Sequence, residues 1–308
     1  MKIAVMGSGG VGGYFGARLA AAGNEVTFIA RGAHLAAIKS QGLTVRSPQG
    51  DIHIHPAHAT DNPSDVGPVD IVLFATKLYD TQSAGELCKS FIGADTAVIS
   101  LLNGVESEDQ LSRILGPEHV VGGVARISAE IAEPGVIQHH SPFDSIEFGE
   151  LDGRRSERLQ AFLRVAEQAR IDARLCDDID AAIWRKFIML ASFSAITTLT
   201  RLAAGPIRDN AECWKLLEAA ARETGAVARA RGVQLSEKDV EDIVGMIQKL
   251  PATMKSSMLM DLERGNRLEL EWLSGAVCRA GIETGVDTPV HRVVLAALGP
   301  FVAGKPTN

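Results

Sequence analysis

A glycine-rich segment close to the N-terminus constrains the fold more than any other feature of this chain. The apolar run KIAVM at residues 2–6 leads into GSGGVG at residues 7–12, and small apolar residues at helical spacing continue to Ala22. This order of strand, glycine-rich turn and helix opens a βαβ unit, and in that setting the pattern GxGxxG binds the pyrophosphate of a dinucleotide. We therefore predict a dinucleotide-binding loop, with a glycine-rich turn that binds nothing as the alternative.

Each glycine of the pattern has its own physical role. Gly7 permits the tight turn, Gly9 lets backbone N–H groups approach the pyrophosphate, and Gly12 lets the helix pack closely on the strand. The phosphate charge then lies at the helix N-terminus, where unpaired N–H groups and the helix dipole favour an anion. The loop residues that we expect to contact the cofactor are Gly7, Ser8, Gly9, Gly10, Val11 and Gly12.

The first half of the chain alternates strand-like and helical segments. Apolar runs predict strands at residues 2–7, 25–30, 70–76 and 97–102. Helical spacing and small residues predict helices at residues 11–22, 34–40 and 81–91. Near-continuous apolar strands separated by crossover helices indicate a doubly wound parallel sheet with helices on both faces. The fold class is therefore α/β.

The second half of the chain changes to helical segments with few strand signals. We predict helices at residues 177–200, 211–231, 236–250 and 267–280. The boundary is placed in the turn IDARLCDD, which gives a dinucleotide-binding domain at residues 1–175 and an all-helical domain at residues 176–308.

Composition excludes several other classes of protein. The formal net charge is −7 and the basic residues are dispersed, so a nucleic-acid surface is not expected. The four cysteines lie far apart, which favours buried thiols over disulfides or zinc. The longest apolar stretch, residues 187–199, is too short to span a bilayer, and the N-terminus turns to glycine after one strand, unlike a signal peptide. We expect a soluble, cytoplasmic protein.

The histidines do not form a recognisable metal-binding pattern. His53, His55 and His58 fall in or near a predicted hairpin strand, and His139 and His140 follow another short strand. A metal site needs ligands that converge, and nothing in this spacing supplies that. We expect these five side chains to face solvent and no metal to be bound.

The end of the second predicted strand indicates which dinucleotide is bound. Enzymes that use NAD usually carry Asp or Glu there for the ribose 2′-OH, whereas this chain has Ala30-Arg31-Gly32. The Arg31 guanidinium suits a 2′-phosphate through charge-assisted bonds. We therefore predict NADP(H) as the cofactor, with a merely solvated arginine as the alternative.

Two polar residues directly follow apolar strands. Lys77 comes after DIVLFAT, and Asn103 comes after AVISLL. Ligands of open α/β sheets bind outside the carboxyl ends of the strands, so both residues lie at the expected ligand edge. The alternative is that each is only a turn residue.

In the helical half, the segment Trp184-Arg185-Lys186 lies on a predicted amphipathic helix. Lys186 has Ile183, Phe187 and Leu190 as neighbours, and partial desolvation would lower its pKa and suit it to donate a proton. The alternative is a lysine that reaches solvent along this apolar surface. Further on, Glu269 and Glu271 are two apart on a predicted helix, so only one of them can point inward.

Taken together, these motifs resemble the ketopantoate reductase (2-dehydropantoate 2-reductase) family over nearly the whole chain. The matching stretches are GSGGVG, FIAR, Thr76-Lys77, Leu102 to Gly104, Trp184 to Lys186, Ser256 to Met258 and LELEWLSG. The resemblance implies a Rossmann-type domain, followed by a helical domain similar to that of 6-phosphogluconate dehydrogenase. It also implies NADPH-dependent reduction of a 2-oxo acid to a 2-hydroxy acid in pantothenate biosynthesis.

The resemblance also implies roles for individual residues. Lys186 is similar to the family's general acid, and Asn103 to the residue that contacts both nicotinamide and substrate. Lys77 resembles a cofactor contact. The remaining implied roles are an acidic residue near the substrate hydroxyl at Glu269, a carboxylate-binding serine at Ser257 and a backbone contact to the cofactor at Ala129.

The sequence departs from the family on the expected substrate wall. Asparagines follow the family's lysine at four and eight positions, and here Leu190 and Ser194 stand there. Both share a helix face with Lys186. Two amides are therefore missing, and each hydrogen bond is worth about 0.5–1.5 kcal/mol net. A 2-oxo acid with a less polar tail than ketopantoate is the resulting second hypothesis.

Two further classes stay open at this point. A β-hydroxy acid dehydrogenase would share the architecture but normally shows a glycine-rich segment resembling VSGG, which is not found here. A protein that senses NADPH would bind it without turnover, although Lys186, Asn103 and Glu269 argue against that. The expected partner is a small 2-oxo acid, and a homodimer stays open.

Overall fold

The computed structural model describes residues 1–305 of the chain. Contacts divide the chain into two compact units. The first unit holds residues 1–102 and 107–179, and the second holds residues 103–106 and those from 180 onward. The boundary predicted after residue 175 falls at the end of strand β12 (Asp172–Leu175), and helix α6 (Ile179–Thr200) begins four residues later.

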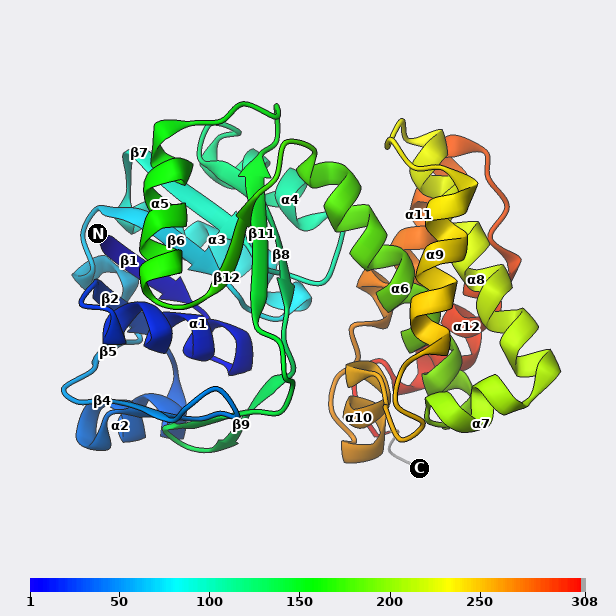
Figure 1. The fold of residues 1–308 in the computed structure, drawn as a ribbon, viewed down its shortest axis with the longest axis horizontal. Helices are drawn as coiled ribbons and strands as arrows, with labels where there is room; N and C mark the ends of the chain where they lie inside the picture. Colours follow the sequence, from blue (N-terminus) through cyan, green and yellow to red (C-terminus); the bar gives the residue numbers. More distant parts are fainter. Residues whose placement is uncertain (306–308) are drawn as a thin grey trace. The chain divides into compact units, whose positions relative to one another are not determined.

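The first unit is built on an eight-stranded sheet (Figure 1). Its strand order is β12-β11-β8-β7-β6-β1-β2-β5. Besides β12, these strands are β1 (Lys2–Met6), β2 (Glu25–Ile29), β5 (His58–Thr60), β6 (Val69–Phe74), β7 (Ile92–Ser100), β8 (Val120–Arg126) and β11 (Ser145–Glu150). The helices of this unit are α1 (Gly10–Ala21), α2 (Gly32–Gln41), α3 (Thr81–Cys88), α4 (Ser107–Leu115) and α5 (Glu157–Gln168).

The α/β class is confirmed, but the sheet is mixed and not purely parallel. Strands β8 and β11 pair antiparallel, whereas the other neighbouring pairs are parallel. A parallel return needs a crossover connection, usually a helix. The described chain has no helix between β8 and β11, whereas α5 lies between β11 and β12, which pair parallel to each other.

A second sheet of four strands, in the order β4-β3-β10-β9, was not predicted as such from the sequence. Its strands are β3 (Leu43–Arg46), β4 (Ile52–Ile54), β9 (Ala129–Glu133) and β10 (Val136–His139). The β3–β4 hairpin agrees with the hairpin strand expected around His53. The parallel pairing of β3 with β10 joins segments about ninety positions apart, and no local pattern announces such a pairing.

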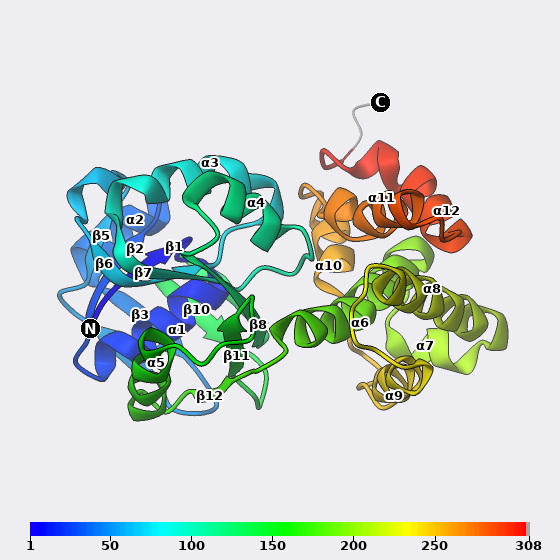
Figure 2. The same ribbon diagram turned by 90° about the horizontal axis from the view of Figure 1, so that it is seen from above.

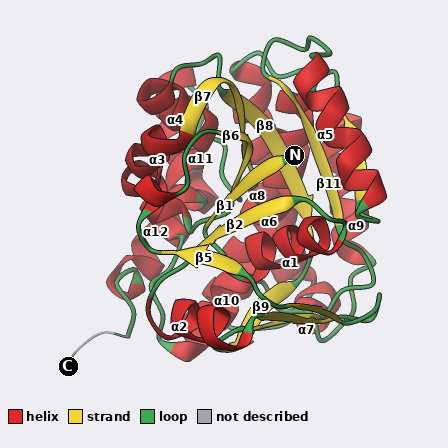
Figure 3. Ribbon diagram, turned by 90° about the vertical axis from the view of Figure 1, so that its left-hand side faces the viewer, coloured by secondary structure: helices red, strands yellow, loops and turns green. Residues whose placement is uncertain are grey.

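Helix α1 packs against both sheets of the first unit (Figure 3). On one side, a Cβ added at Gly12 or Gly16 would come within 3 Å of the Val5 side chain. On another side, a Cβ at Gly10 would collide with the Ala129 carbonyl, and one at Gly13 would come within 3 Å of Ile137. The additional glycines of GGVGGYFG therefore let α1 approach two sheets closely.

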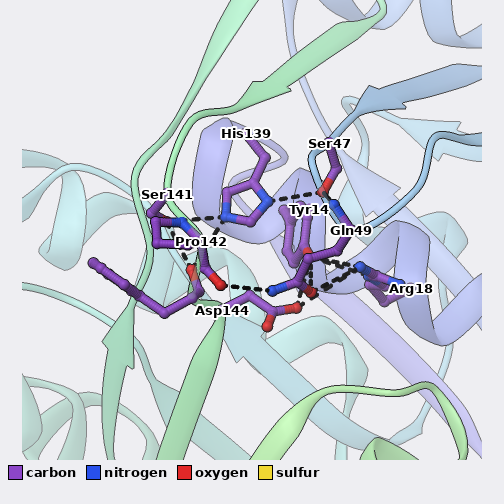
Figure 4. Close-up of polar contacts among 9 residues, drawn as sticks. Tyr14, Arg18, Ser47, Gln49, His139, Ser141, Pro142 and Asp144 are labelled. Carbon is purple, nitrogen blue, oxygen red and sulfur yellow. Dashed lines mark hydrogen bonds and ion pairs between the residues drawn. The ribbon is translucent and has the colours of Figure 1, made fainter.

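A buried polar network joins α1 to loops of the smaller sheet (Figure 4). The Tyr14 hydroxyl donates to Asp144 Oδ2 at 2.6 Å and accepts from Arg18 Nε at 3.1 Å. His139 contacts Ser47 Oγ through Nδ1 and Ser141 Oγ through Nε2, both at 2.9 Å. Burial, together with the bond to Asp144, raises the pKa of Tyr14 to about 12, so this hydroxyl keeps its proton.

This network corrects the prediction for one histidine. His139 is only 1% exposed, because its ring packs against Tyr14 and both ring nitrogens are hydrogen-bonded, so it does not face solvent. His53, His55, His58 and His140 are exposed, as predicted. Within residues 1–305, no three His, Cys, Asp or Glu side chains gather as metal ligands would.

The second unit is entirely helical in its described part (Figure 2). Besides α6, its helices are α7 (Ala204–Asp209), α8 (Ala211–Ala230), α9 (Glu237–Gln248), α10 (Ser257–Arg264), α11 (Ser274–Thr284) and α12 (Pro289–Leu298). Helix α6 is apolar on nearly all sides, which is typical of a helix buried at the centre of a core. No helix in the described residues is long and apolar enough to cross a membrane.

The helix predicted at residues 267–280 is wrong in its first half. A 3₁₀ turn covers Leu270–Trp272, and α11 begins only at Ser274. The Leu268 N–H donates to the Val302 carbonyl, and the dihedral angles of Leu273 (φ −102°, ψ −92°) are not helical. The backbone bond of Leu268 to the distant residue Val302 therefore replaces the helical bonds expected at the start of this segment.

A carboxyl group is buried where α4 begins. Glu108 accepts a hydrogen bond from Ser107 Oγ at 2.9 Å, and Ser107 also accepts one from Ser100 Oγ. Burial raises the pKa of Glu108 to about 7. The folded state therefore holds this proton to higher pH than the unfolded state, and stability is lost as pH rises through 7.

We expect Glu108→Gln to remove this loss. A rise of the pKa from 4.5 to about 7 corresponds to about 3 kcal/mol in the free energy of unfolding, fully present below pH 4.5 and gone above 7. Glu108→Gln should therefore raise the midpoint of urea unfolding above that of the wild type at pH 8 and much less at pH 5. Exposed Glu167→Gln serves as the control. Equal pH dependence of wild type and Glu108→Gln would contradict the prediction.

Candidate functional site

The phosphate loop opens α1 without any side chain that caps it. Gly9 is the N-cap residue, and the first turn of the helix holds no acidic residue. The space beside Gly9 is open, because a Cβ added there would meet no atom within 4 Å. Gly7 has φ +94°, a left-handed conformation that favours glycine, and lies against the Ala75 carbonyl. Unpaired N–H groups at an open helix N-terminus suit a phosphate, so the loop fits a dinucleotide.

Ser8 fixes this loop to the neighbouring strand. Its N–H and its hydroxyl both donate to the Ile29 carbonyl, at 3.1 and 3.0 Å, and its side chain is buried. Both donors of Ser8 are therefore directed to the end of β2. Val11, in the first turn of α1, is half-buried against the core.

Ala129, expected from the resemblance to contact the cofactor through its backbone, lies against the phosphate loop. Its carbonyl occupies the place where a side chain at Gly10 would be, so the start of β9 touches the first residue of α1. The smaller sheet therefore forms one side of the phosphate loop.

Arg31 directly follows β2 and precedes α2. Its side chain is exposed, and within residues 1–305 no hydrogen bond or ion pair holds the guanidinium. A free, exposed guanidinium at the end of the second strand is available for an added phosphate group.

Two residues follow β6 directly. Lys77, predicted from the sequence, is exposed and precedes a 3₁₀ turn. Thr76, which was not predicted as a ligand, lies beside the loop, since a Cβ added at Gly7 would be 2.9 Å from the Thr76 nitrogen. The Thr76 hydroxyl oxygen is buried and has no partner in the described part of the chain. A buried hydroxyl without a partner beside the glycine loop is a donor that a bound group could satisfy.

In the second unit, two of the predicted residues are brought together. Lys186, half-buried on α6, donates from Nζ to Asn103 Oδ1 at 2.9 Å. Asn103 belongs to this unit although the residues on either side of segment 103–106 belong to the other. The ammonium of Lys186 is therefore held by an amide from a distant part of the sequence.

On the face of α6 that carries Lys186, the next residues are an apolar one, Leu190, and then one with a hydroxyl group, Ser194. Leu190 is half-buried, and Ser194 is 2% exposed with no hydrogen-bond partner for its hydroxyl among the described residues. Ser192 and Thr197, by contrast, donate to carbonyls four residues earlier on the helix. Ser194 thus keeps an unused hydrogen-bonding group on the face of Lys186.

The two remaining predicted residues lie near other elements of the second unit. Glu269 is 7% exposed and precedes the 3₁₀ turn at Leu270–Trp272. Ser257 is exposed and is the first residue of α10. Its neighbour Ser256 is buried, caps α10 by accepting the Leu259 N–H, and bonds Thr197 Oγ1 on α6 at 2.7 Å. The N-terminus of α10 is therefore joined to α6.

Two family models match this chain. They are described as ketopantoate reductase PanE/ApbA, over residues 3–153, and ketopantoate reductase PanE/ApbA C terminal, over residues 178–301. Together they cover both units.

Individual proteins are similar over almost their whole length. A 2-dehydropantoate 2-reductase of Archaeoglobus fulgidus is 32% identical over 96% of this chain and 95% of its own. An uncharacterized oxidoreductase of Bacillus subtilis, YkpB, is 31% identical over 99% of this chain and its whole length. The crystal structure of a PanE/ApbA family ketopantoate reductase from Ralstonia eutropha has a TM-score of 0.90 and 32% identity, and 98% of each chain is covered.

Two adjacent glycines of the loop should respond differently to the same substitution. We expect Gly10→Ala to destabilise the fold by about 1–3 kcal/mol, because the methyl group meets the Ala129 backbone, and to lower the Tm by several degrees. Gly9→Ala, with open space, should keep the Tm but weaken binding of the nicotinamide dinucleotide about tenfold, because its methyl group occupies the approach to the loop. Thermal unfolding and fluorescence titration measure the two effects. An unchanged Kd of Gly9→Ala for the nicotinamide dinucleotide would contradict the assignment of the loop.

Proposed function

The chain is an oxidoreductase that belongs to the ketopantoate reductase PanE/ApbA family, and from this premise we propose that it reduces ketopantoate to pantoate with NADPH. The observation that carries the proposal is the hydrogen bond between Lys186 and Asn103. It holds an ammonium group at a fixed place on α6, as the reduction of a ketone requires.

When bound, a reduced nicotinamide would supply a hydride to the carbonyl carbon of the substrate. Negative charge then develops on the carbonyl oxygen, and the Lys186 ammonium stabilises this charge and donates a proton to it. Asn103 accepts one N–H of Lys186 and so fixes where the ammonium group lies on α6. In this proposal Glu269 lies near the hydroxyl that forms, and Ser257 binds the substrate carboxylate.

The first unit supplies the cofactor contacts of the proposal. The N–H groups at the start of α1 bind the pyrophosphate, with the backbone of Ala129 beside them. Arg31 binds the 2′-phosphate, which favours NADP(H) over NAD(H). Lys77 and the buried hydroxyl of Thr76 are further contacts at the end of β6.

A second candidate substrate follows from the substrate wall. Leu190 places an apolar side chain one turn from Lys186, where the family carries an amide, and Ser194 offers only a hydroxyl. A 2-oxo acid with a less polar tail would lose no hydrogen bonds to this wall. The reaction and its residues would be the same.

The first experiment measures kcat/KM for NADPH oxidation with ketopantoate and with a panel of 2-oxo acids that have less polar tails. An optimum at ketopantoate supports the proposal, and an optimum elsewhere supports the second candidate. We expect Lys186→Ala to lower kcat by about 10²–10⁴-fold with every substrate, while NADPH binding is kept. Exposed Lys249→Ala in the same unit is the matched control. Binding of NADPH without turnover of any 2-oxo acid would refute the reductase.

Arg31→Ala tests the choice of cofactor. Loss of charge-assisted bonds, worth about 1.5–3 kcal/mol, should raise the KM for NADPH about 10- to 100-fold and leave the KM for NADH nearly unchanged. Arg113→Ala, which removes another exposed guanidinium of the first unit, should change neither KM. Equal effects of Arg31→Ala on both cofactors would show that Arg31 does not bind the 2′-phosphate.

A further inference from the structure

The β9–β10 hairpin contacts the phosphate loop directly at its base and, through one side chain, at its turn. At its base, the Ala129 carbonyl lies against Gly10. At its turn, Gly135 has φ +81° and is buried against α2 and β3, with its carbonyl accepting the Thr44 N–H at 2.9 Å. The turn is therefore held firmly enough to serve as an anchor.

One side chain connects this turn to the loop. His34, in the first turn of α2, contacts the Ser8 carbonyl through Nε2 at 2.9 Å and accepts the Gly135 N–H at Nδ1 at 3.0 Å. A backbone N–H can only donate, so Nδ1 carries the lone pair and the proton is on Nε2, which donates to Ser8. Burial lowers the pKa of His34, which agrees with a neutral ring that uses both nitrogens.

The bond to Ser8 orients the next residue of the loop. The Ser8 carbonyl and the Gly9 N–H belong to one planar trans peptide, in which the two groups point in opposite directions. Fixing the carbonyl toward His34 therefore turns the Gly9 N–H away from it. Within residues 1–305 this N–H has no hydrogen-bond partner, and the space beside Gly9 is open.

The other polar groups of Ser8 cannot replace this bond. The N–H and the hydroxyl of Ser8 both donate to the Ile29 carbonyl. They therefore fix the nitrogen and the side chain of Ser8, whereas the orientation of the peptide between Ser8 and Gly9 depends on the bond to His34. The loop is thus held from β2 on one side and from the hairpin, through His34, on the other.

We propose that His34 is a positioning residue of the cofactor site, which aims the Gly9 N–H at the pyrophosphate by holding the Ser8 carbonyl against the β9–β10 turn. This inference rests on the proposed function only in that the loop binds NADPH. It assigns to His34 no contact with the cofactor and no part in the chemistry. Its effect is on affinity, since a loop whose peptide can rotate presents the donor less often.

Three substitutions separate the two bonds of His34. His34→Ala removes both of them. His34→Gln places an amide nitrogen at the position of Nε2 and can still donate to Ser8, whereas His34→Asn places an oxygen at the position of Nδ1 and can accept only from Gly135. His58→Ala, an exposed histidine of the same unit, is the control.

The readout is the Kd of NADPH from fluorescence titration, with the Tm of each protein measured without cofactor. We expect His34→Ala and His34→Asn to raise Kd about tenfold and His34→Gln to stay within about threefold of the wild type. At saturating NADPH, kcat should change little. A Kd near the wild-type value for His34→Gln, but not for His34→Asn, would show that the bond to Ser8 matters. A general loss of stability would instead lower the Tm of both variants without making the Kd of His34→Asn higher than that of His34→Gln.

Two results would overturn the proposal. One is a Kd for His34→Ala and His34→Gln equal to that of the wild type, and the other is rescue by Asn and not by Gln. If His34→Ala does not fold, the comparison of His34→Gln with His34→Asn decides. A wild-type protein that binds no NADPH would instead refute the proposed function, whereas turnover failing while NADPH binds leaves the His34 comparison intact.

Discussion

Helix α1 packs between two sheets, and it can do so only because glycine occupies four of its positions. The absence of side chains at Gly12 and Gly16 lets the larger sheet pack closely on the helix, and their absence at Gly10 and Gly13 does the same for the smaller sheet. Side chains at these positions would push one layer away. The open N-terminus of the helix, at Gly9, is what this close packing holds in place. The cofactor half of the proposed site depends on that constraint.

The close packing is completed by polar groups that are almost all satisfied. Tyr14 on α1 donates to Asp144 and accepts from Arg18, and His139 bonds to Ser47 and Ser141 in loops next to the smaller sheet (Figure 4). Buried polar groups of this kind are costly when unpaired and specify one arrangement when paired. At the loop itself the Gly9 N–H and the Thr76 hydroxyl have no partner in the described residues. The unused donors therefore lie where a phosphate is expected.

The second unit contributes a different kind of constraint. Lys186 is carried by an apolar central helix, where a charge needs a partner, and Asn103 supplies one. Segment 103–106 is held to this unit a second time by the ion pair between Glu106 and Arg279 at 2.7 Å. The strand-end residue Asn103 is thus tied to helical elements and not to the sheet that precedes it.

Much of this could be predicted because it is written in short stretches of sequence. Local spacing determines the strand–loop–helix order around residues 2–22, the apolar strands and the run of helices after residue 176. It also predicts that Lys186 lies on a helix and that Asn103 follows a strand. The antiparallel strand β11, the smaller sheet and the broken helix at residue 270 did not follow, because each depends on a distant backbone partner. By itself the sequence determined the fold class, the glycine loop and the family. Only the tertiary structure decided that His139 is buried and that His34 joins Ser8 to Gly135, since residues a hundred positions apart meet through packing and not through any pattern along the chain.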